Sequence, residues 1–222
     1  MPVITVARQF GAGGASIARI VAERLGMEIV DQSLVAAIAT QLGEPEDRVR
    51  AEDEHVASGR FSGLLDVLSP LSGGLGMAWQ PPYPDPKYDP RRVVVNLTEE
   101  VIRETARRGN VVIVGRGGAF VLADLPGALH VFLRAAEPVR LKTAMDRFGL
   151  DEAAARARLR ETDANREAYM RQIYGRDWQD ASHYDLVIDT GTLGYDAAAE
   201  LIVLAAQRKV AAIRSDAKLA PD

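Results

Sequence analysis

The chain has 222 residues, of which 47% are hydrophobic and 26% charged, and its formal net charge is −4. This length supports one well-buried domain with a small insertion, and the acidic balance argues against a broad nucleic-acid-binding surface. The absence of cysteine excludes disulfides and thiolate metal sites. No apolar run is long enough to span a membrane, and the N-terminus lacks signal-peptide features, so we expect a cytoplasmic protein with no membrane partner. The sequence carries no signal for an oligomeric state.

A short apolar strand opens the chain and leads into a glycine-rich turn and an amphipathic helix. Residues 3–7 are mostly β-branched, which is typical of a buried strand. From Ser16 the apolar side chains recur at helical spacing as far as Gly26, a typical helix C-cap. A second strand is predicted at 27–30, closed by Asp31. Beyond it we expect a helix at 33–42, further helices within 44–69 and a proline-rich loop at 70–92.

The second half of the chain alternates short apolar strands with helices. Helices are predicted at 90–108, 138–148, 151–174 and 195–209. Strands are predicted at 111–114, 129–133 and 186–188, and residues 210–222 are expected to form an irregular tail. Short apolar strands that alternate with helices indicate a parallel sheet with βαβ crossovers. The sequence therefore predicts a three-layer α/β/α sandwich with a five-stranded parallel sheet.

The glycine-rich turn is a candidate phosphate-binding loop. A strand that runs through glycines into a helix presents unpaired backbone N–H groups and the positive end of the helix dipole to an anion. The alternative is a turn that serves packing only. The candidate phosphate-binding residues are Arg8, Gly11, Ala12, Gly13, Gly14, Ala15 and Ser16.

This loop departs from the full P-loop pattern, which places a lysine where the chain has Gly14. The lysine contacts the β- and γ-phosphates, so another cation has to supply its charge. Arg8 stands where the first glycine of the pattern would be, and we expect it to be the substitute. Ser16 either contacts a phosphate or Mg²⁺, or caps the helix.

Three segments in the right order resemble the cytidylate kinase-like family. Residues 4–14 resemble its phosphate loop, residues 112–117 its third-strand motif ending in Gly-Arg-Gly, and residues 176–190 its C-terminal strand region. The resemblance implies the fold of P-loop nucleoside monophosphate kinases, with ATP and Mg²⁺ as cofactors and CMP or dCMP as the phosphoryl acceptor. It also implies one kinase-like domain at residues 1–210, which contains an acceptor-side insertion at 44–95 and an arginine-rich lid at 140–176. Residues 211–222 are then a C-terminal tail.

Three positions depart from the family pattern. Gly14 replaces the lysine, Gly117 replaces an aspartate that helps to bind the acceptor nucleotide, and residues 34–37 lack the arginine that grips the acceptor phosphate. These departures keep two other functions open. One is a nucleotide-binding protein with lost or weakened kinase activity that acts as a sensor or partner module. The other is a kinase with a non-nucleotide acceptor.

Four residues are candidates for catalysis, and a fifth for magnesium or the acceptor. Arg116 directly follows a buried strand, at the sheet edge where ligands collect. Asp163 and Arg166 resemble the Asp-x-x-Arg element of the family's lid, where the aspartate contacts the acceptor sugar and the arginine a phosphate. Arg160 shares their helix face, although a solvated, salt-bridged helix is the alternative. Asp31 either binds Mg²⁺ through water, orients the acceptor, or caps the next element, and no direct metal ligands are expected.

Overall fold

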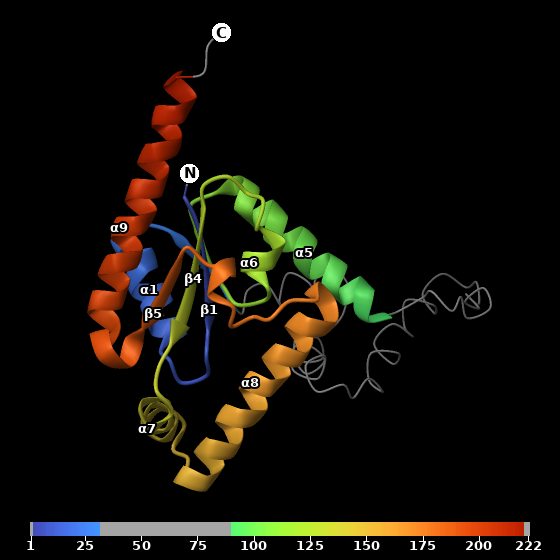
Figure 1. Ribbon diagram of the computed structural model, residues 1–222, viewed down its shortest axis with the longest axis vertical. Helices are drawn as coiled ribbons and strands as arrows, with labels where there is room; N and C mark the ends of the chain where they lie inside the picture. The colour runs from blue at the N-terminus through green and yellow to red at the C-terminus, as the bar shows by residue number, and fades with distance from the viewer. Residues whose placement is uncertain (1, 32–89, 220–222) are drawn as a thin grey trace, which may run out of the picture. The chain divides into compact units, whose positions relative to one another are not determined.

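The computed structural model describes residues 2–31 and 90–219 (Figure 1). The sheet lies in a unit formed by residues 1–31 and 102–222, whereas residues 32–101 belong to a second unit. The helices predicted at 33–42 and within 44–69, and nearly all of the loop predicted at 70–92, lie outside the described residues. Among the described helices, none is both long and apolar enough to cross a bilayer.

Five parallel strands form one sheet, as the sequence predicts, and the structure gives their order as β2-β3-β1-β4-β5. The strands are β1 Val3–Arg8, β2 Glu28–Val30, β3 Val111–Val114, β4 Ala128–Arg134 and β5 Leu186–Asp189. Val6 of β1 lies opposite Val114 of β3, and Arg8 lies opposite Leu133 of β4. The carboxyl ends of β1, β3 and β4 therefore lie next to one another. This is the point where the strand order changes direction, and open α/β sheets bind ligands there.

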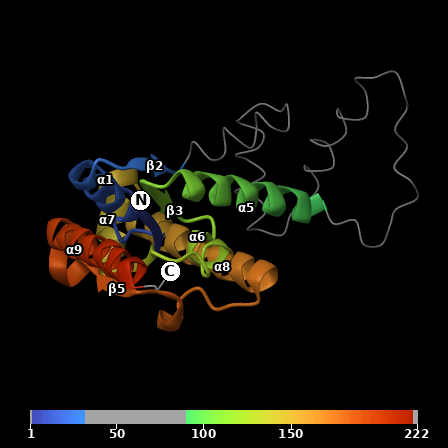
Figure 2. The same ribbon diagram turned by 90° about the horizontal axis from the view of Figure 1, so that it is seen from above.

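Helices cover both faces of the sheet (Figures 1 and 2). The described helices are α1 Gly14–Leu25, α5 Pro90–Arg108, α6 Gly118–Val121, α7 Glu137–Phe148, α8 Glu152–Tyr174 and α9 Thr190–Leu219. Helices α1 and α9 pack on one face, where Ile17 and Ile202 are fully buried against Val6 and its neighbours. Burying each such aliphatic side chain contributes about 1.5–3 kcal/mol. Helix α6 lies on the other face, and α7 and α8 lie beyond the carboxyl ends of the strands.

Four features differ from the sequence prediction. Helix α9 reaches Leu219, so most of the predicted irregular tail is helical, although the apolar pattern there is too weak to indicate it. Helix α1 begins at Gly14 with Gly13 as its N-cap and no side-chain capping bond. Ser16 lies in the first turn and does not cap the helix, which corrects that alternative. The short helix α6 and a 3₁₀ turn at Ala181–His183 are also missed by the sequence pattern.

Candidate functional site

The phosphate loop is shaped by two glycines in the left-handed region, Gly11 at φ 80° and Gly13 at φ 78°. Both are also closely packed. A Cβ atom at Gly11 would lie 2.6 Å from the carbonyl oxygen of Arg140, and one at Gly13 would collide with the ring of Tyr195. The backbone thus passes between α7 and α9 only without side chains at these positions, and it delivers the N-terminus of the twelve-residue α1 to the carboxyl edge of the sheet.

Arg8 fills the space next to the lysine position of the loop. A Cβ atom at Gly14 would lie 2.6 Å from Cγ of Arg8, and one at Gly115 would collide with its guanidinium. The Arg8 side chain is only 22% exposed, and its Nη2 lies 3.9 Å from the carboxylate of Asp31. Burial lowers the pKa of Arg8, whereas the charge of Asp31 raises it. The stem of an arginine from β1 therefore occupies the place of a side chain at position 14.

Arg166 reaches the same place from helix α8. Its Nη1 donates to the backbone oxygen of Arg8 at 2.9 Å and lies 3.4 Å from Oδ1 of Asp163. Burial, together with the positive charges of Arg8 and Arg116, lowers the pKa of Arg166 to about 9, although the charge of Asp163 acts in the opposite direction. Because Arg8 and Arg116 both lower the pKa of Arg166, the three guanidinium groups lie within electrostatic reach of one another, and an anion bound among them would relieve this repulsion.

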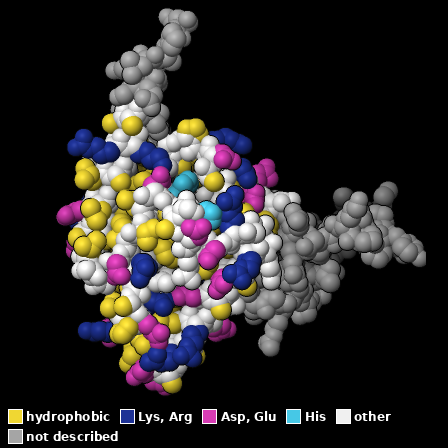
Figure 3. All heavy atoms as spheres, viewed as in Figure 1, with side chains coloured by type: hydrophobic (Ala, Val, Ile, Leu, Met, Phe, Trp, Pro, Cys, Tyr) yellow, Lys and Arg dark blue, Asp and Glu magenta, His cyan; other side chains and the backbone are white. Residues whose placement is uncertain are grey.

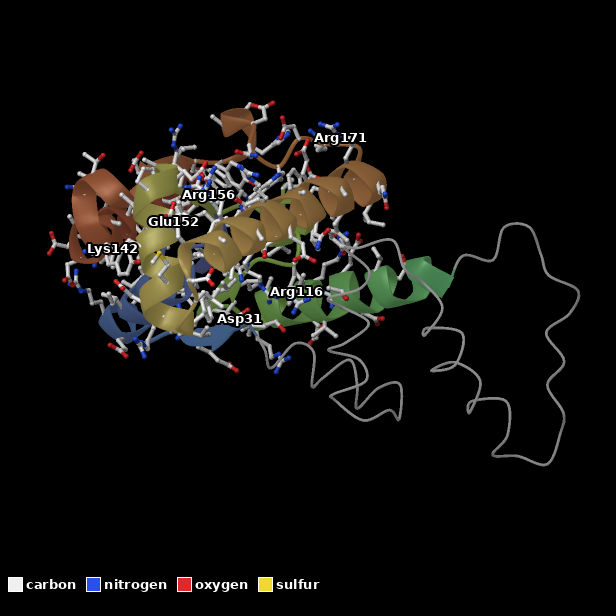
Figure 4. The ribbon with its side chains drawn as sticks, turned by 90° about the horizontal axis from the view of Figure 1, so that it is seen from below. Asp31, Arg116, Lys142, Glu152, Arg156 and Arg171 are labelled. Carbon is white, nitrogen blue, oxygen red and sulfur yellow. The ribbon has the colours of Figure 1, made fainter. Side chains whose placement is uncertain are left out.

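Arg116 is held in an uncommon backbone conformation. Its φ is 57°, between Gly115 at 78° and Gly117 at 69°, so three consecutive residues are left-handed. This conformation costs a non-glycine residue roughly 1–2 kcal/mol and is found mostly where function requires it. Figure 4, which looks onto the carboxyl edge of the sheet, shows Asp31 and Arg116 beside α8. The turn thus presents Arg116 at the edge where the sequence places it.

Asp163 links helix α8 to the phosphate loop. Its Oδ1 accepts from the backbone N–H of Phe10 at 2.9 Å, and its Oδ2 accepts from Nη1 of Arg140 at 2.5 Å. The same nitrogen of Arg140 donates to the backbone oxygen of Phe10 at 3.3 Å. The side chain of Asp163 is 18% exposed and that of Arg140 is 13% exposed. The sequence analysis misses Arg140, because nothing in its spacing distinguishes it from the solvated arginines nearby.

The remaining arginines of α8 lie outside this group. Arg156 pairs with Glu152 at 2.8 Å and also with Glu137, and Arg171 pairs with Glu167 at 2.9 Å. Arg160 is exposed, and none of the contacts described above involves it. Toward the lower end of Figure 3, basic and acidic side chains are interspersed over α7 and the start of α8. Helix α8 is thus salt-bridged on its outer side and brings Asp163 and Arg166 to the loop.

A cavity of about 60 Å³ adjoins the three arginines. It is lined by residues 5–8 of β1, by residues 115–120, and by Arg166, Met170, Trp178 and Tyr184. The ring of Tyr174 packs near its rim, because a Cβ atom at Gly117 would lie 2.8 Å from Cε2 of Tyr174. The cavity lining therefore combines three arginines with three aromatic side chains, those of Phe120, Trp178 and Tyr184.

The sheet order, the glycine-rich loop after β1 and the basic residues that face it define a P-loop fold of the nucleoside monophosphate kinase type. The chain belongs to the cytidylate kinase-like family, whose sequence profile matches residues 3–192. This confirms the resemblance seen in the sequence.

Individual relatives support the same family. The chain is 27% identical over 202 residues to the cytidylate kinase of Ignicoccus hospitalis, covering 91% of this chain and 97% of that one. It is 37% identical over 103 residues to the cytidylate kinase of Methanopyrus kandleri, a match that covers 42% of this chain and only 53%, or about half, of that relative. A crystal structure of an uncharacterized protein from Eubacterium ventriosum has a TM-score of 0.65, covering 93% of this chain and 99% of that one. At 20% identity this likeness shows the fold alone.

Two of the three departures from the family pattern have a packing explanation. The space for a side chain at Gly14 is taken by Arg8, and the space at Gly117 is taken by Tyr174. Each missing polar group is therefore matched by a larger side chain that arrives from another element. The third departure, within residues 34–37, lies outside the described residues.

Proposed function

We propose that this protein is a phosphotransferase that moves the γ-phosphoryl group of ATP to a nucleoside monophosphate, with CMP or dCMP as the acceptor. The observation that carries the proposal is the hydrogen bond from Arg166 to the backbone of Arg8 at 2.9 Å. It brings the arginine of the lid helix onto the phosphate loop, within electrostatic reach of Arg8 and Arg116.

In this proposal the backbone N–H groups at the start of α1 bind the phosphates of ATP, and Arg8 supplies the charge that the lysine provides elsewhere. The bond from the γ-phosphorus to the bridging oxygen of ADP breaks as a bond to the acceptor's phosphate oxygen forms. Charge spreads over the transferred group, and Arg116 and Arg166 stabilise it without having to reorient. Mg²⁺ bound with ATP would neutralise further charge, and Asp31 is the carboxylate that would hold it through water.

A second candidate is a nucleotide-binding module with weakened catalysis. The observation in its favour is that Gly14 and Gly117 are both closed by neighbouring side chains, so the family's lysine and aspartate have no room. A kinase with a non-nucleotide acceptor is compatible with the same observation, because Gly117 replaces a residue that helps to bind the acceptor nucleotide in the family.

The proposal is tested by incubating the purified chain with ATP, Mg²⁺ and each nucleoside monophosphate in turn, and following ADP. Turnover with CMP or dCMP is expected. Calorimetry with ATP, GTP and CTP shows whether nucleotide binds at all. Nucleotide binding without turnover on any monophosphate would reject the nucleotide-kinase function and favour the binding module. Turnover with a different monophosphate would keep the kinase and correct the acceptor.

A further inference from the structure

One of the aromatic side chains that line the cavity carries a buried polar group without a partner among the described residues. Trp178 lines the cavity and is 2% exposed. Its indole Nε1 has no hydrogen-bond partner in the part of the chain that the structure describes. A buried donor left unpaired costs roughly 1–3 kcal/mol, and native proteins rarely leave one without a reason.

The indole is held firmly in place. The Tyr184 hydroxyl donates to the backbone oxygen of Trp178 at 2.6 Å, and the Trp178 ring packs edge-on against Phe132 with ring centroids 5.4 Å apart. Burial and, to a smaller extent, the negative charge of Asp177 both raise the pKa of Tyr184. The hydroxyl therefore stays protonated and remains a donor. The position of the N–H group is therefore fixed before any ligand arrives.

The chemistry of the lining defines what fits. Arg8, Arg116 and Arg166 favour an anion, whereas apolar lining residues such as Phe120 and Met170 disfavour a charge next to them. An indole N–H only donates, so its partner has to carry a lone pair. At about 60 Å³ the cavity is smaller than the roughly 150 Å³ that accommodates a benzene ring. It therefore takes the edge of a ring or a small substituent.

Resting on the proposed function, we propose that this cavity is the subsite for the far end of the phosphoryl acceptor. The Trp178 indole N–H donates to a neutral lone pair of that end, a carbonyl oxygen or a ring nitrogen, while Arg116 and Arg166 hold the acceptor's phosphate. Trp178 is then a specificity-determining residue, because an acceptor without a lone pair at this position leaves the indole unpaired.

The indole N–H resonance tests this directly. The chain has two tryptophans, Trp79 and Trp178. In ¹⁵N-labelled protein the Trp79→Phe variant leaves one indole resonance, which assigns Trp178. The wild type is titrated with CMP, dCMP, UMP and AMP, and with inorganic phosphate as the control. We expect at least one monophosphate to move the Trp178 resonance downfield, and phosphate alone not to do so.

The outcomes separate the subsite from the proposed function. A downfield shift without ADP formation keeps the subsite and rejects the kinase activity. ADP formation or calorimetric binding without a shift rejects the subsite, and a trapped water on the indole is then the explanation. A shift that phosphate alone reproduces also rejects it. If no monophosphate binds or turns over, both proposals are wrong.

A kinetic comparison adds a second readout. Trp178→Phe removes the N–H group and keeps an aromatic ring. We expect the KM for the acceptor to rise about two- to tenfold, with kcat and the KM for ATP close to wild type. An unchanged acceptor KM in a stably folded variant would overturn the role of Trp178, and the wild-type titration decides the matter if the variant does not fold.

Discussion

Restoring the missing P-loop lysine should harm this protein. A Cβ atom at position 14 would lie 2.6 Å from Cγ and 3.0 Å from Cβ of Arg8, well inside normal contact. Overpacking of this kind typically costs about 1–3 kcal/mol. For a chain of this length each kcal/mol lowers the melting temperature by roughly 2–4 °C. We therefore expect Gly14→Lys to melt about 2–12 °C below the wild type.

The double variant Arg8→Gly/Gly14→Lys is the matched test. Removing the arginine side chain frees the space, and the new lysine supplies the positive charge. The hydrogen bond from Arg166 survives, because it is made to the backbone of residue 8. We expect the double variant to regain most of the melting temperature, and to bind ADP more tightly than Arg8→Gly alone by about ten- to a hundredfold, as for a hydrogen bond to a charged group.

Thermal unfolding and calorimetry with ADP measure both effects. If Gly14→Lys alone melted at the wild-type temperature and bound ADP at least as tightly, Arg8 would not occupy the place assigned to it. The same conclusion follows if Gly14→Lys and the double variant behave alike, because the two substitutions would then be uncoupled.

Three other perturbations probe the site and its support. Arg166→Ala should lower kcat about a hundred- to a thousandfold and weaken ADP binding much less, whereas Arg171→Ala, on the outer side of α8, serves as the control; equal kcat values in steady-state assays would remove Arg166 from the mechanism. Gly117→Asp should lower the free energy of unfolding, measured in urea, by about 1–3 kcal/mol, because residue 117 has a φ of 69° and lies against the ring of Tyr174. An added Tyr174→Ala substitution should recover part of this loss. No recovery would contradict the packing explanation. Burial lowers the pKa of His130, so the unfolded chain takes up the proton at a higher pH than the folded chain does. The free energy of unfolding should therefore fall as the pH drops below about 6.5. His130→Gln should lose this pH dependence, and an unchanged dependence would assign it to other groups.

Local signals account for most of the fold. The strand at Val111–Val114 is an uninterrupted apolar run, and the turns at Gly26 and Gly149 need a left-handed backbone that favours glycine. Such features depend on neighbouring residues and can be predicted from the sequence. The C-terminal part of α9 could not, because its residues lack a strong apolar period.

The site depends on contacts between distant segments, which sequence patterns resolve only in part. Arg8 and Arg166 are 158 residues apart in the chain. The loop itself predicted a phosphate-binding role for Arg8, whereas only the resemblance to a family predicted one for Arg166. Arg140 could not be predicted, because an arginine that donates to Phe10 and Asp163 has the same neighbours in the sequence as a solvated arginine. The roles of Arg116 and Asp31 in catalysis stay predictions.

The central claim is that three arginines without a P-loop lysine suffice for phosphoryl transfer. It is tested most directly with ATP labelled in its γ-phosphate, supplied with Mg²⁺ and CMP or dCMP. We predict labelled CDP or dCDP from the wild type, and a loss of label transfer when Arg8 is replaced by glutamine. Bound ATP with no labelled diphosphate from either acceptor would contradict the account.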